Sequence, residues 1–333
     1  MSEKAKNTGR FWAYDASQAR DADLTLLDNV QFIYELSLAQ WELSSLGADY
    51  EITNGLREFR LNNKSNELSE RIIKKTSYFK SVGTNFTDYF QIIRKNRTRS
   101  VNQYLSHWIY PYKGKFHPQM IRALLNIIGL KEDDTVFEPF SGSGTTALEA
   151  QLLGINFMGI DISPVCILQG KVKTGSLNAI DEIIKCKNDL VSEIKPSLFN
   201  REQDFYKVLE EIKNNQVRDF FTLARLLAVS DESRRGRSFE QSFIRNLNLM
   251  IDSVSDYKEI SETLNLKLGH VDLKEGDSRN IELPDDSVDG IVTSPPYSIA
   301  LDYVENDAHS LEDMGYKPAE IRENFIGVRG KGK

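Results

Sequence analysis

The sequence predicts an α/β fold whose core is a parallel β-sheet of about four strands, flanked by two helical regions. A strand, a glycine turn, a helix and a second strand follow one another over residues 135–161, two more strand-like segments occur near the C-terminus, and helical patterns fill most of the rest. A strand, a helix and a second strand in this order form a βαβ unit, whose strands are parallel and joined by a right-handed crossover. The length of 333 residues exceeds the usual size of one domain and leaves room for both helical regions.

Residues 1–105 are expected to form a helical N-terminal region. Apolar residues such as Leu27, Val30, Ile33 and Leu36 recur at helical spacing, and few segments alternate as a strand would.

Residues 106–175 are expected to form the first part of the core. An irregular segment with Pro and Gly, residues 110–118, leads into the first helix. The predicted elements that follow are a helix over 119–128, a strand over 135–140, a turn over 141–144, a helix over 145–153 and a strand over 156–161.

The remaining residues divide into two parts. Residues 176–266 have helical patterns almost throughout and are expected to form a helical insertion, with a break at 231–238. Residues 267–333 are expected to form the second part of the core. Its predicted elements are strands over 273–277 and 288–293 and short helices over 309–314 and 317–325.

Composition limits the class of protein. With 40% apolar and 27% charged residues, the chain resembles an ordinary soluble globular protein, and it has no run of about 18 apolar residues that could span a membrane. The N-terminus lacks the apolar stretch of a signal peptide, which favours the cytoplasm. The two cysteines, Cys166 and Cys186, have no metal-ligand spacing, so we expect reduced thiols and no metal site.

The net charge of −7 argues against a protein that coats nucleic acid nonspecifically, because that function needs many basic residues against phosphates. Three local basic clusters occur, at residues 94–99, 234–237 and 329–333. Each is as compatible with a solvated loop as with a phosphate contact.

The glycine turn at Gly142 and Gly144 lets the backbone approach a ligand closely at the end of the first core strand. Asp161 ends the second strand about twenty positions on, where an acid can bind ribose hydroxyls. The third glycine of a dinucleotide fingerprint and the lysine of a P-loop are both missing, which disfavours NAD and ATP. Acidic and small residues suit a cofactor with a sulfonium centre better, and Glu138 and Asp277 fit such a site. Asp277 fits a turn residue equally well.

The segment Ser294-Pro-Pro-Tyr297 follows an apolar strand, and its two prolines force a rigid exit from the sheet. A Ser hydroxyl and a Pro carbonyl can accept hydrogen bonds from the two N–H groups of a base amine, while Tyr297 stacks on the extruded base. Methyl transfer would then be a direct displacement governed by proximity and orientation. A simple Pro-Pro turn is the alternative for this segment taken alone.

Together these motifs resemble those of the DNA amino-methyltransferase family. The resemblance rests on five segments: Lys113–Pro118, Phe140–Thr145, Gly159–Ser163, Glu275–Asn280 and Thr293–Tyr297. It covers residues 110–175 and 273–329 and implies a Rossmann-like methyltransferase sheet with S-adenosyl-L-methionine as cofactor and double-stranded DNA as substrate. Ser294 favours N4 of cytosine, with N6 of adenine as the alternative, and a restriction-modification system is the expected setting.

The resemblance implies two sets of site residues. The cofactor-binding set is Lys115, Phe116, His117, Pro118, Glu138, Phe140, Gly142, Gly144, Thr145, Asp161, Asp277 and Ser278, and the catalytic set is Ser294, Pro295, Pro296 and Tyr297. Asp302 and Tyr303 either line the base pocket or begin the next helix. The insertion, with Arg234, Arg235 and Arg237, is the candidate for target recognition.

The sequence departs from the family after Tyr297. About three strands are expected there, but the 36 remaining residues have helix and loop patterns. Either the N-terminal helical region substitutes for part of the missing sheet, or the missing strands lie on another polypeptide. We expect the second, which makes this chain a split or truncated methyltransferase subunit. A noncatalytic recognition or assembly subunit is the alternative outside the enzyme class.

Overall fold

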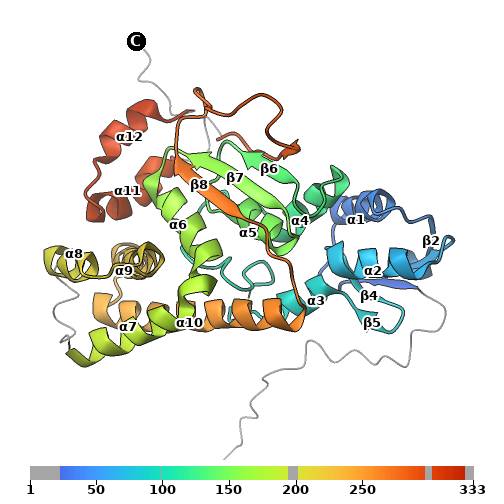
Figure 1. The fold of residues 1–333 in the computed structure, drawn as a ribbon, viewed down its shortest axis with the longest axis horizontal. Coiled ribbons are helices and arrows are strands. Elements are labelled where there is room, and N and C mark those ends of the chain that lie inside the picture. Colours follow the sequence, from blue (N-terminus) through green and yellow to red (C-terminus); the bar gives the residue numbers. More distant parts are fainter. Residues whose placement is uncertain (1–22, 99, 194–201, 297–301, 327–333) are drawn as a thin grey trace, which may run out of the picture.

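The computed structural model describes residues 23–98, 100–193, 202–296 and 302–326. Within these residues one β-sheet lies at one end of the molecule and a second β-sheet lies near its centre (Figure 1). The N-terminal residues form a small antiparallel sheet, and the central and C-terminal residues form a parallel sheet.

The N-terminal region is mixed α/β, so the prediction of a helical region over residues 1–105 was wrong. Its five strands pair antiparallel in the order β2-β3-β1-β4-β5. Each strand has two to four residues, too few to establish an apolar alternation in the sequence. The elements are β1 (Leu24–Leu26), α1 (Ile33–Ser45), β2 (Tyr50–Thr53), a 3-10 turn η2 (Asn54–Leu56), β3 (Glu58–Leu61), α2 (Asn66–Lys75), β4 (Phe79–Val82), β5 (Asn85–Phe86) and α3 (Asp88–Ile93).

The N-terminal region is joined to the core by a buried polar contact as well as by apolar packing. Glu42 of α1 is fully buried, and its carboxylate accepts hydrogen bonds from the Ser77 amide at 3.0 Å and from the Asn126 side chain of α4 (Pro118–Ile127) at 2.8 Å. Burial raises the pKa of Glu42. A buried acid with this many donors fixes the angle at which α1 meets the core.

The parallel sheet confirms the predicted fold class. Four strands occur in the order β8-β7-β6-β9, and all neighbouring pairs are parallel. Their bounds are β6 (Thr135–Glu138), β7 (Asn156–Asp161), β8 (Val271–Glu275) and β9 (Gly290–Ile291). Since the strands are parallel, their carboxyl ends meet at one edge, where open α/β sheets bind ligands.

Helices cover one face of this sheet. They are α4 (Pro118–Ile127), α5 (Thr145–Leu152) and α6 (Pro164–Gly175). Val136 and Phe157 point to the helical side, where they join a fully buried apolar cluster. Phe137, Met158 and Ile160 point to the opposite face, where the described residues provide only the loop at 280–283 as a cover (Figure 1).

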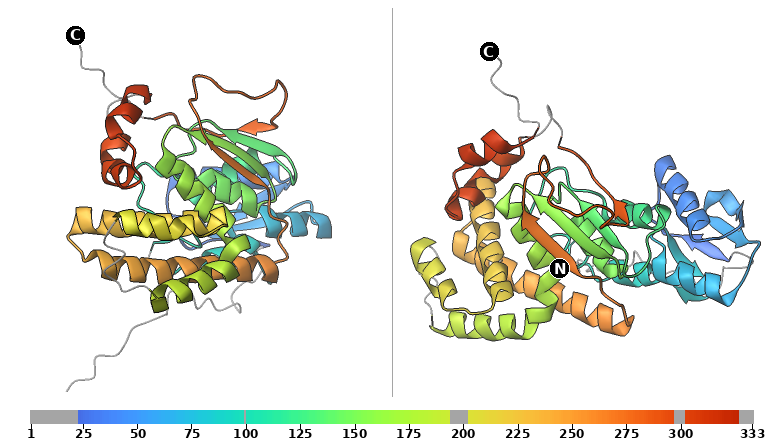
Figure 2. Two further views of the ribbon diagram at one scale, coloured as in Figure 1. Left: turned by 60° about the vertical axis from the view of Figure 1, so that its left-hand side comes forward. Right: turned by 45° about the horizontal axis from the view of Figure 1, so that its top comes forward.

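Helices also fill residues 176–263, beside the parallel sheet (Figure 2). Their bounds are η3 (Ser176–Ala179), α7 (Ile180–Glu193), α8 (Glu202–Glu210), α9 (Asn215–Arg235) and α10 (Phe239–Thr263). Helix α9 continues to Arg235, through part of the predicted break, and ends at Gly236 with φ of 61°. The C-terminal helices are α11 (Tyr303–Asp313) and α12 (Pro318–Asn324).

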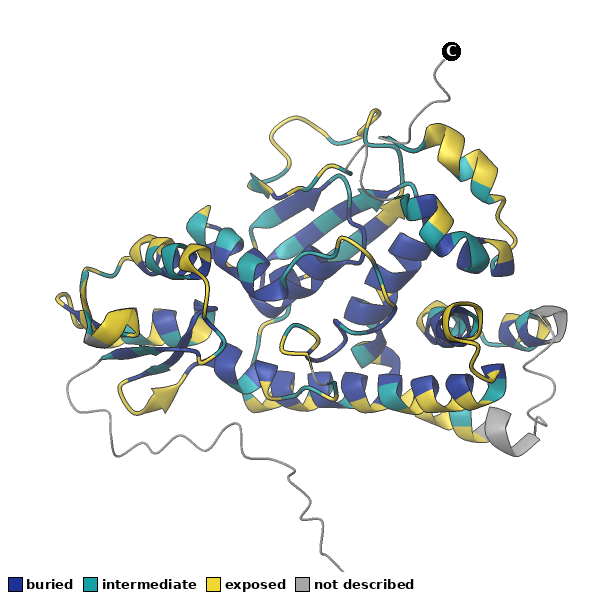
Figure 3. Ribbon diagram, turned by 180° about the vertical axis from the view of Figure 1, so that it is seen from behind, coloured by how far each residue is buried: buried dark blue, intermediate teal, exposed yellow. Residues whose placement is uncertain are grey.

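Burial is continuous through α5 and most of α6 and follows one side of α10, whereas it alternates along β7 (Figure 3). Helices α6, α9, α10 and α11 share one apolar cluster, which contains Val172, Phe220, Met250 and Leu311. The C-terminal helices are therefore packed on the insertion. Among the described residues, no helix is long and apolar enough to cross a membrane.

Candidate active site

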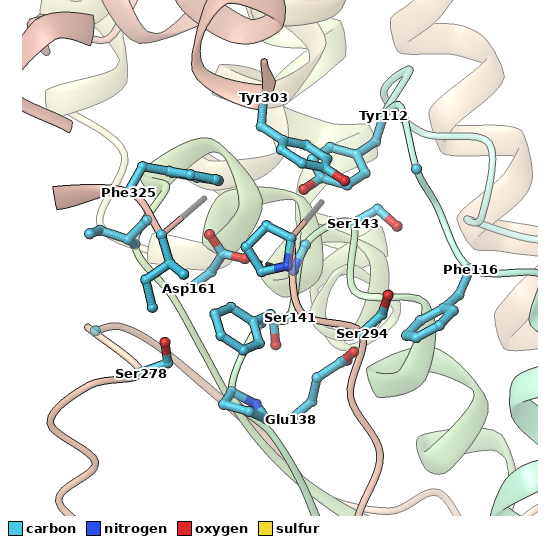
Figure 4. A pocket seen from close by; sticks show the side chains of 18 of the residues that line it. Tyr112, Phe116, Glu138, Ser141, Ser143, Asp161, Ser278, Ser294, Tyr303 and Phe325 are labelled. Atoms are coloured by element: carbon cyan, nitrogen blue, oxygen red, sulfur yellow. Dashed lines mark hydrogen bonds between the residues drawn. The ribbon is translucent and has the colours of Figure 1, made fainter. Parts of the chain in front are cut away.

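A pocket with about 740 Å³ of empty space lies at the carboxyl ends of the parallel strands (Figure 4). It is lined by residues that follow β6, β7, β8 and β9 and by residues of the C-terminal helices. The sheet topology therefore brings the two separate motif regions of the sequence into one site.

The glycine turn after β6 depends on two glycines. Gly142 and Gly144 have φ of 47° and 71°, a backbone conformation that other residues adopt at a cost. A Cβ on Gly144 would lie 2.8 Å from the Cα of Gly170 in α6. The turn thus packs backbone against backbone, and Gly144 supports the site from behind instead of lining it.

Asp161 at the end of β7 fixes this turn. One carboxylate oxygen accepts the Gly142 amide at 2.7 Å, and the other accepts the Ser163 amide at 2.9 Å. Burial raises the pKa of Asp161 although these backbone donors oppose the shift. Asp161 also lines the pocket, so the predicted ribose-binding acid orients the turn as well.

Glu138 ends β6 and provides an unpaired buried acid. Its side chain is 1% exposed and lines the pocket, and its Oε2 atom has no hydrogen-bond partner among the described residues. Burial raises its pKa well above the usual range. A buried carboxylate oxygen without a partner is costly, and a cation in the pocket would offset that cost.

Two buried lysines lie behind and beside the glycine turn. Lys173 of α6 donates to the Ser143 carbonyl at 2.7 Å, and Lys115 donates to the His107 carbonyl and lines the pocket. Burial lowers the pKa of Lys115 to about 8 and that of Lys173 well below its usual value. Lys115 and the amide groups that begin α5 offer positive potential for an anionic group.

Asp277 and Ser278, after β8, line the far end of the pocket. The Asp277 carboxylate accepts the Arg279 amide and the Arg279 Nε, each at 2.9 Å, and these hydrogen bonds lower its pKa to about 2. Asp277 is therefore both a pocket residue and a turn residue, which combines the two interpretations that the sequence left open.

The catalytic motif follows β9, which pairs with β6 through Val136 and Phe137. Ser294 and Pro296 line the pocket, and Pro295 is exposed outside it. Tyr297 lies outside the described residues. Ser294 and Glu138 thus share one cavity, although 156 positions separate them in the sequence.

Four of the sequence-predicted residues do not line the pocket: His117, Pro118, Gly144 and Pro295. His117 is the N-cap of α4, and Pro118 is its first residue, buried against the core. The other described members of both sets line the pocket: Lys115, Phe116, Glu138, Phe140, Gly142, Thr145, Asp161, Asp277, Ser278, Ser294 and Pro296.

Two aromatic residues of the pocket, Tyr112 and Phe325, were missed from the sequence, and Tyr303, which the sequence left as either a base-pocket residue or the start of a helix, lines the pocket with them. Tyr112, Tyr303 and Phe325 form what we call the aromatic roof, opposite Glu138 (Figure 4). The ring centroids are 5.9 Å apart for Tyr112 and Tyr303 and 5.8 Å apart for Tyr303 and Phe325, with planes within 25° of parallel in both pairs. Tyr303 begins α11 as well as lining the pocket. Their aromatic character is the only feature of the sequence that could have indicated a shared site. Because about two hundred positions separate Tyr112 from the other two residues, the sequence does not show that they lie together.

The arginines proposed for target recognition have partners within the chain. Arg235 and Arg237 lie 2.8 Å and 3.6 Å from the carboxylate of Asp231, and Arg234 lies 3.5 Å from that of Asp307. In the cluster at 94–99, Arg97 pairs with Asp256, and residues 329–333 lie outside the described part. Arg245 pairs with Asp231 as well, so three arginines share this one carboxylate and the cluster around Asp231 keeps a net positive charge.

The residues of the pocket fit S-adenosylmethionine. Glu138 provides an unpaired carboxylate for a cationic centre, Lys115 and the start of α5 suit a carboxylate tail, and Asp161 is placed to meet a ribose. No group of three His, Cys, Asp or Glu side chains that could hold a metal occurs among the described residues. The sheet and this pocket define a Rossmann-like methyltransferase fold with S-adenosylmethionine as its cofactor.

Comparisons with known proteins support this class. Residues 7–171 match the family of DNA methylases specific for N6 or N4 amines. Type II methyltransferase M.MjaII of Methanocaldococcus jannaschii is 31% identical over 169 residues, which cover 50% of this chain and 29% of that protein. Type II methyltransferase M.BsoBI of Geobacillus stearothermophilus is 27% identical over 285 residues, which cover 67% of this chain and 55% of that protein.

Over these segments the chain is similar to DNA methylases that modify N6 or N4 amines. It spans between about a third and about half of the length of these two relatives. A tRNA (guanine(10)-N2)-dimethyltransferase of Methanocaldococcus jannaschii is 33% identical over 100 residues, 30% of this chain and 26% of that protein. The solved rRNA methyltransferase AviRa of Streptomyces viridochromogenes aligns with a TM-score of 0.30 and 11% identity over 69% of this chain and 79% of that chain, a similarity too low to carry an argument.

Proposed function

We propose that this chain is the cofactor-binding and catalytic part of a DNA methyltransferase that modifies the exocyclic amine of a flipped base, with N4 of cytosine as the preferred target. The observation that supports this proposal most directly is the single pocket that holds both Glu138 and Ser294, at the carboxyl ends of neighbouring strands. When bound, S-adenosylmethionine supplies the methyl group as a sulfonium cation.

The residues have separate roles in the proposed reaction. Glu138 faces the cationic end of the cofactor and holds it beside the carboxyl end of β9. The Ser294 hydroxyl and a proline carbonyl after it accept hydrogen bonds from the two N–H groups of the amine, which turns the nitrogen lone pair out of conjugation with the ring. Transfer then depends on orientation of the nitrogen toward the methyl group, with the pocket excluding water.

The preference for cytosine rests on Ser294 at the first position of the catalytic motif. N6 of adenine is the alternative within the enzyme class. Relatives named Type II methyltransferases favour a restriction-modification system as the setting, with DNA in the cytoplasm as the substrate.

We further propose that a second polypeptide completes the parallel sheet. Among the described residues β9 pairs only with β6, so its other edge has no strand partner, and Ile291 on β9 is 59% exposed. The face formed by Phe137, Met158 and Ile160 has no covering helix in the described part either. Parallel sheets are normally covered on both faces, and an open apolar edge favours association.

Nucleotide-resolution mapping of modified bases in DNA tests the main proposal. The purified chain and S-adenosylmethionine are incubated with DNA, alone and then with the polypeptide encoded next to it. We expect N4-methylcytosine at a defined sequence, and only in the presence of the second polypeptide. N6-methyladenine would select the alternative base, methylation by the chain alone would exclude the required partner, and absence of any methylation in both reactions would favour a noncatalytic recognition subunit.

A further inference from the structure

We propose that the aromatic roof is the stacking site for the purine ring of the cofactor, with Phe325 as its principal contact. This inference rests on the proposed function, because it assigns a further part of the same pocket. It concerns residues at 112, 303 and 325, which lie outside all the motif segments on which the family resemblance rests.

The position of the aromatic roof along the pocket indicates that it contacts the nucleoside end of the cofactor and not the amino-acid end. The strand order places β8 and β7 on one side of the site and β9 on the other. Asp161 ends β7 and suits the ribose. The pocket lining continues from Asp161 to Gly276 and Ser278 after β8, which leaves space there for a base attached to that ribose. The end of α12 is tied to this same place, since the Arg279 guanidinium donates to the Asn324 carbonyl at 3.2 Å.

Figure 4 places Phe325 on the same side of the pocket as Ser278, whereas Ser294 and Phe116 lie on the opposite side. A planar group that binds beside Ser278 would therefore contact the Phe325 ring, and the Tyr303 ring lies beside Phe325. Tyr303 is stacked between Tyr112 and Phe325, and all three rings line the pocket, so the face of a pocket-lining ring such as Phe325 is available to a flat heteroaromatic group.

The roof is held in place by contacts on both sides of the pocket. On one side, the Tyr112 ring packs on the glycine turn, since a Cβ on Gly142 would lie 3.3 Å from it. On the other, Asp313 of α11 accepts two hydrogen bonds from the buried Arg225 of α9, at 2.8 Å and 2.7 Å. The helical insertion thus anchors α11 above the pocket.

A second anchor lies nearer the pocket. The buried Tyr110 hydroxyl lies 3.2 Å from the Asp307 carboxylate and 2.6 Å from the Ser310 hydroxyl, both on α11. Since these contacts form within the protein alone, the aromatic surface exists before a ligand arrives. A preformed surface lowers the ordering cost of binding.

The experiment measures the binding of two probes by titration calorimetry. S-adenosylhomocysteine carries the whole cofactor skeleton, and adenosine carries only the nucleoside end. Phe325→Ala removes the ring, and Phe325→Leu keeps apolar bulk without an aromatic face. Phe86→Ala is the matched control, because Phe86 is an exposed phenylalanine on β5 of the N-terminal sheet. Thermal unfolding of each variant verifies that it folds.

Loss of a stacking contact should weaken both probes by at least about tenfold in Phe325→Ala, and by nearly as much in Phe325→Leu, with no change in Phe86→Ala. Lys115→Gln should weaken S-adenosylhomocysteine and leave adenosine unchanged, because Lys115 lies toward the tail of the cofactor. Equal affinity of wild type and Phe325→Ala for both probes would overturn the stacking site while leaving the proposed function intact.

Two further outcomes are decisive. Unchanged probe affinity in Phe325→Ala, together with weaker binding of a cytosine-containing oligonucleotide, would reassign the roof to the target base. Failure of the wild-type chain to bind S-adenosylhomocysteine would overturn both the stacking site and the proposed methyltransferase function.

Discussion

The two halves of the pocket differ in how strongly the protein fixes them. In the cofactor half, the glycine turn is held by Asp161, Lys173 and a backbone contact with Gly170, all in the buried core. In the catalytic half, Ser294 follows a two-residue strand that pairs on one side only, and its neighbours Thr293 and Pro295 are exposed. From this difference we infer that the chain itself holds the cofactor half in its binding geometry. The geometry of the catalytic half depends more on the polypeptide proposed to pack beside β9.

Removal of the Ser294 hydroxyl should give the largest effect and tests the catalytic half. Ser294→Ala should lower kcat for methyl transfer by about 100-fold or more, because the amine loses the acceptor that orients its lone pair. The affinity for S-adenosylhomocysteine should stay unchanged. Thr293→Ala, one position away and outside the pocket lining, is the control and should retain transfer. Full activity of Ser294→Ala would refute the assigned role.

A change at the glycine turn tests the cofactor half. Gly144→Ala should lower the free energy of unfolding in urea by about 3 kcal/mol, from positive-φ strain and overlap with Gly170 together. Gly236→Ala is the matched control, with a similar φ of 61° and nothing within 4 Å of the added Cβ, and should cost only about 1 kcal/mol. Equal losses in the two variants would show that close packing at Gly144 is unimportant.

Replacement of Glu138 should change ligand affinity and the free energy of unfolding in opposite directions. Glu138→Gln should bind S-adenosylmethionine, whose sulfonium is cationic, about tenfold more weakly, because the negative charge that would face the sulfonium is lost. S-adenosylhomocysteine, whose thioether sulfur is neutral, should bind the variant nearly as well as wild type. The pKa of Glu138 is raised in the folded state, so its ionisation destabilises the ligand-free protein as pH rises above the unfolded value near 4.5. The variant should therefore be at least as stable as wild type at pH 7, measured by urea unfolding. A less stable variant would contradict the assignment of an unsatisfied carboxylate.

The smallest expected effect is the loss of ligand affinity when Lys115 loses its proton at high pH. Its pKa of about 8 means that the ammonium group loses its proton as pH rises from 7 to 9, which should weaken binding of the anionic tail about threefold. Lys115→Arg keeps its charge throughout this range. Because the α-amino group of the ligand also titrates near pH 8, the test is the ratio of the two dissociation constants against pH. A constant ratio would show that Lys115 does not contribute charge to the site.

The sequence was most informative where short-range physical chemistry determines structure. Gly142 and Gly144, the apolar strand before them and Asp161 predict the βαβ unit almost to its observed bounds, because turns and buried strands leave local signals. It failed in the N-terminal region, where strands as short as Leu24–Leu26 form only by pairing with Glu58–Leu61 and Phe79–Val82. Such pairing is nonlocal, and helix-like spacing of leucines concealed it.

By itself, then, the sequence determined the class of the fold, the family resemblance and the motif residues that line the pocket, because those properties reside in contiguous segments. Only the tertiary structure decided that Tyr112, Tyr303 and Phe325 lie together, that Glu138 has an unpaired oxygen, and that the insertion arginines face carboxylates of the same chain. Each of these depends on which distant side chains share a buried volume. Sheet order and helix packing set that property, and local spacing does not encode it.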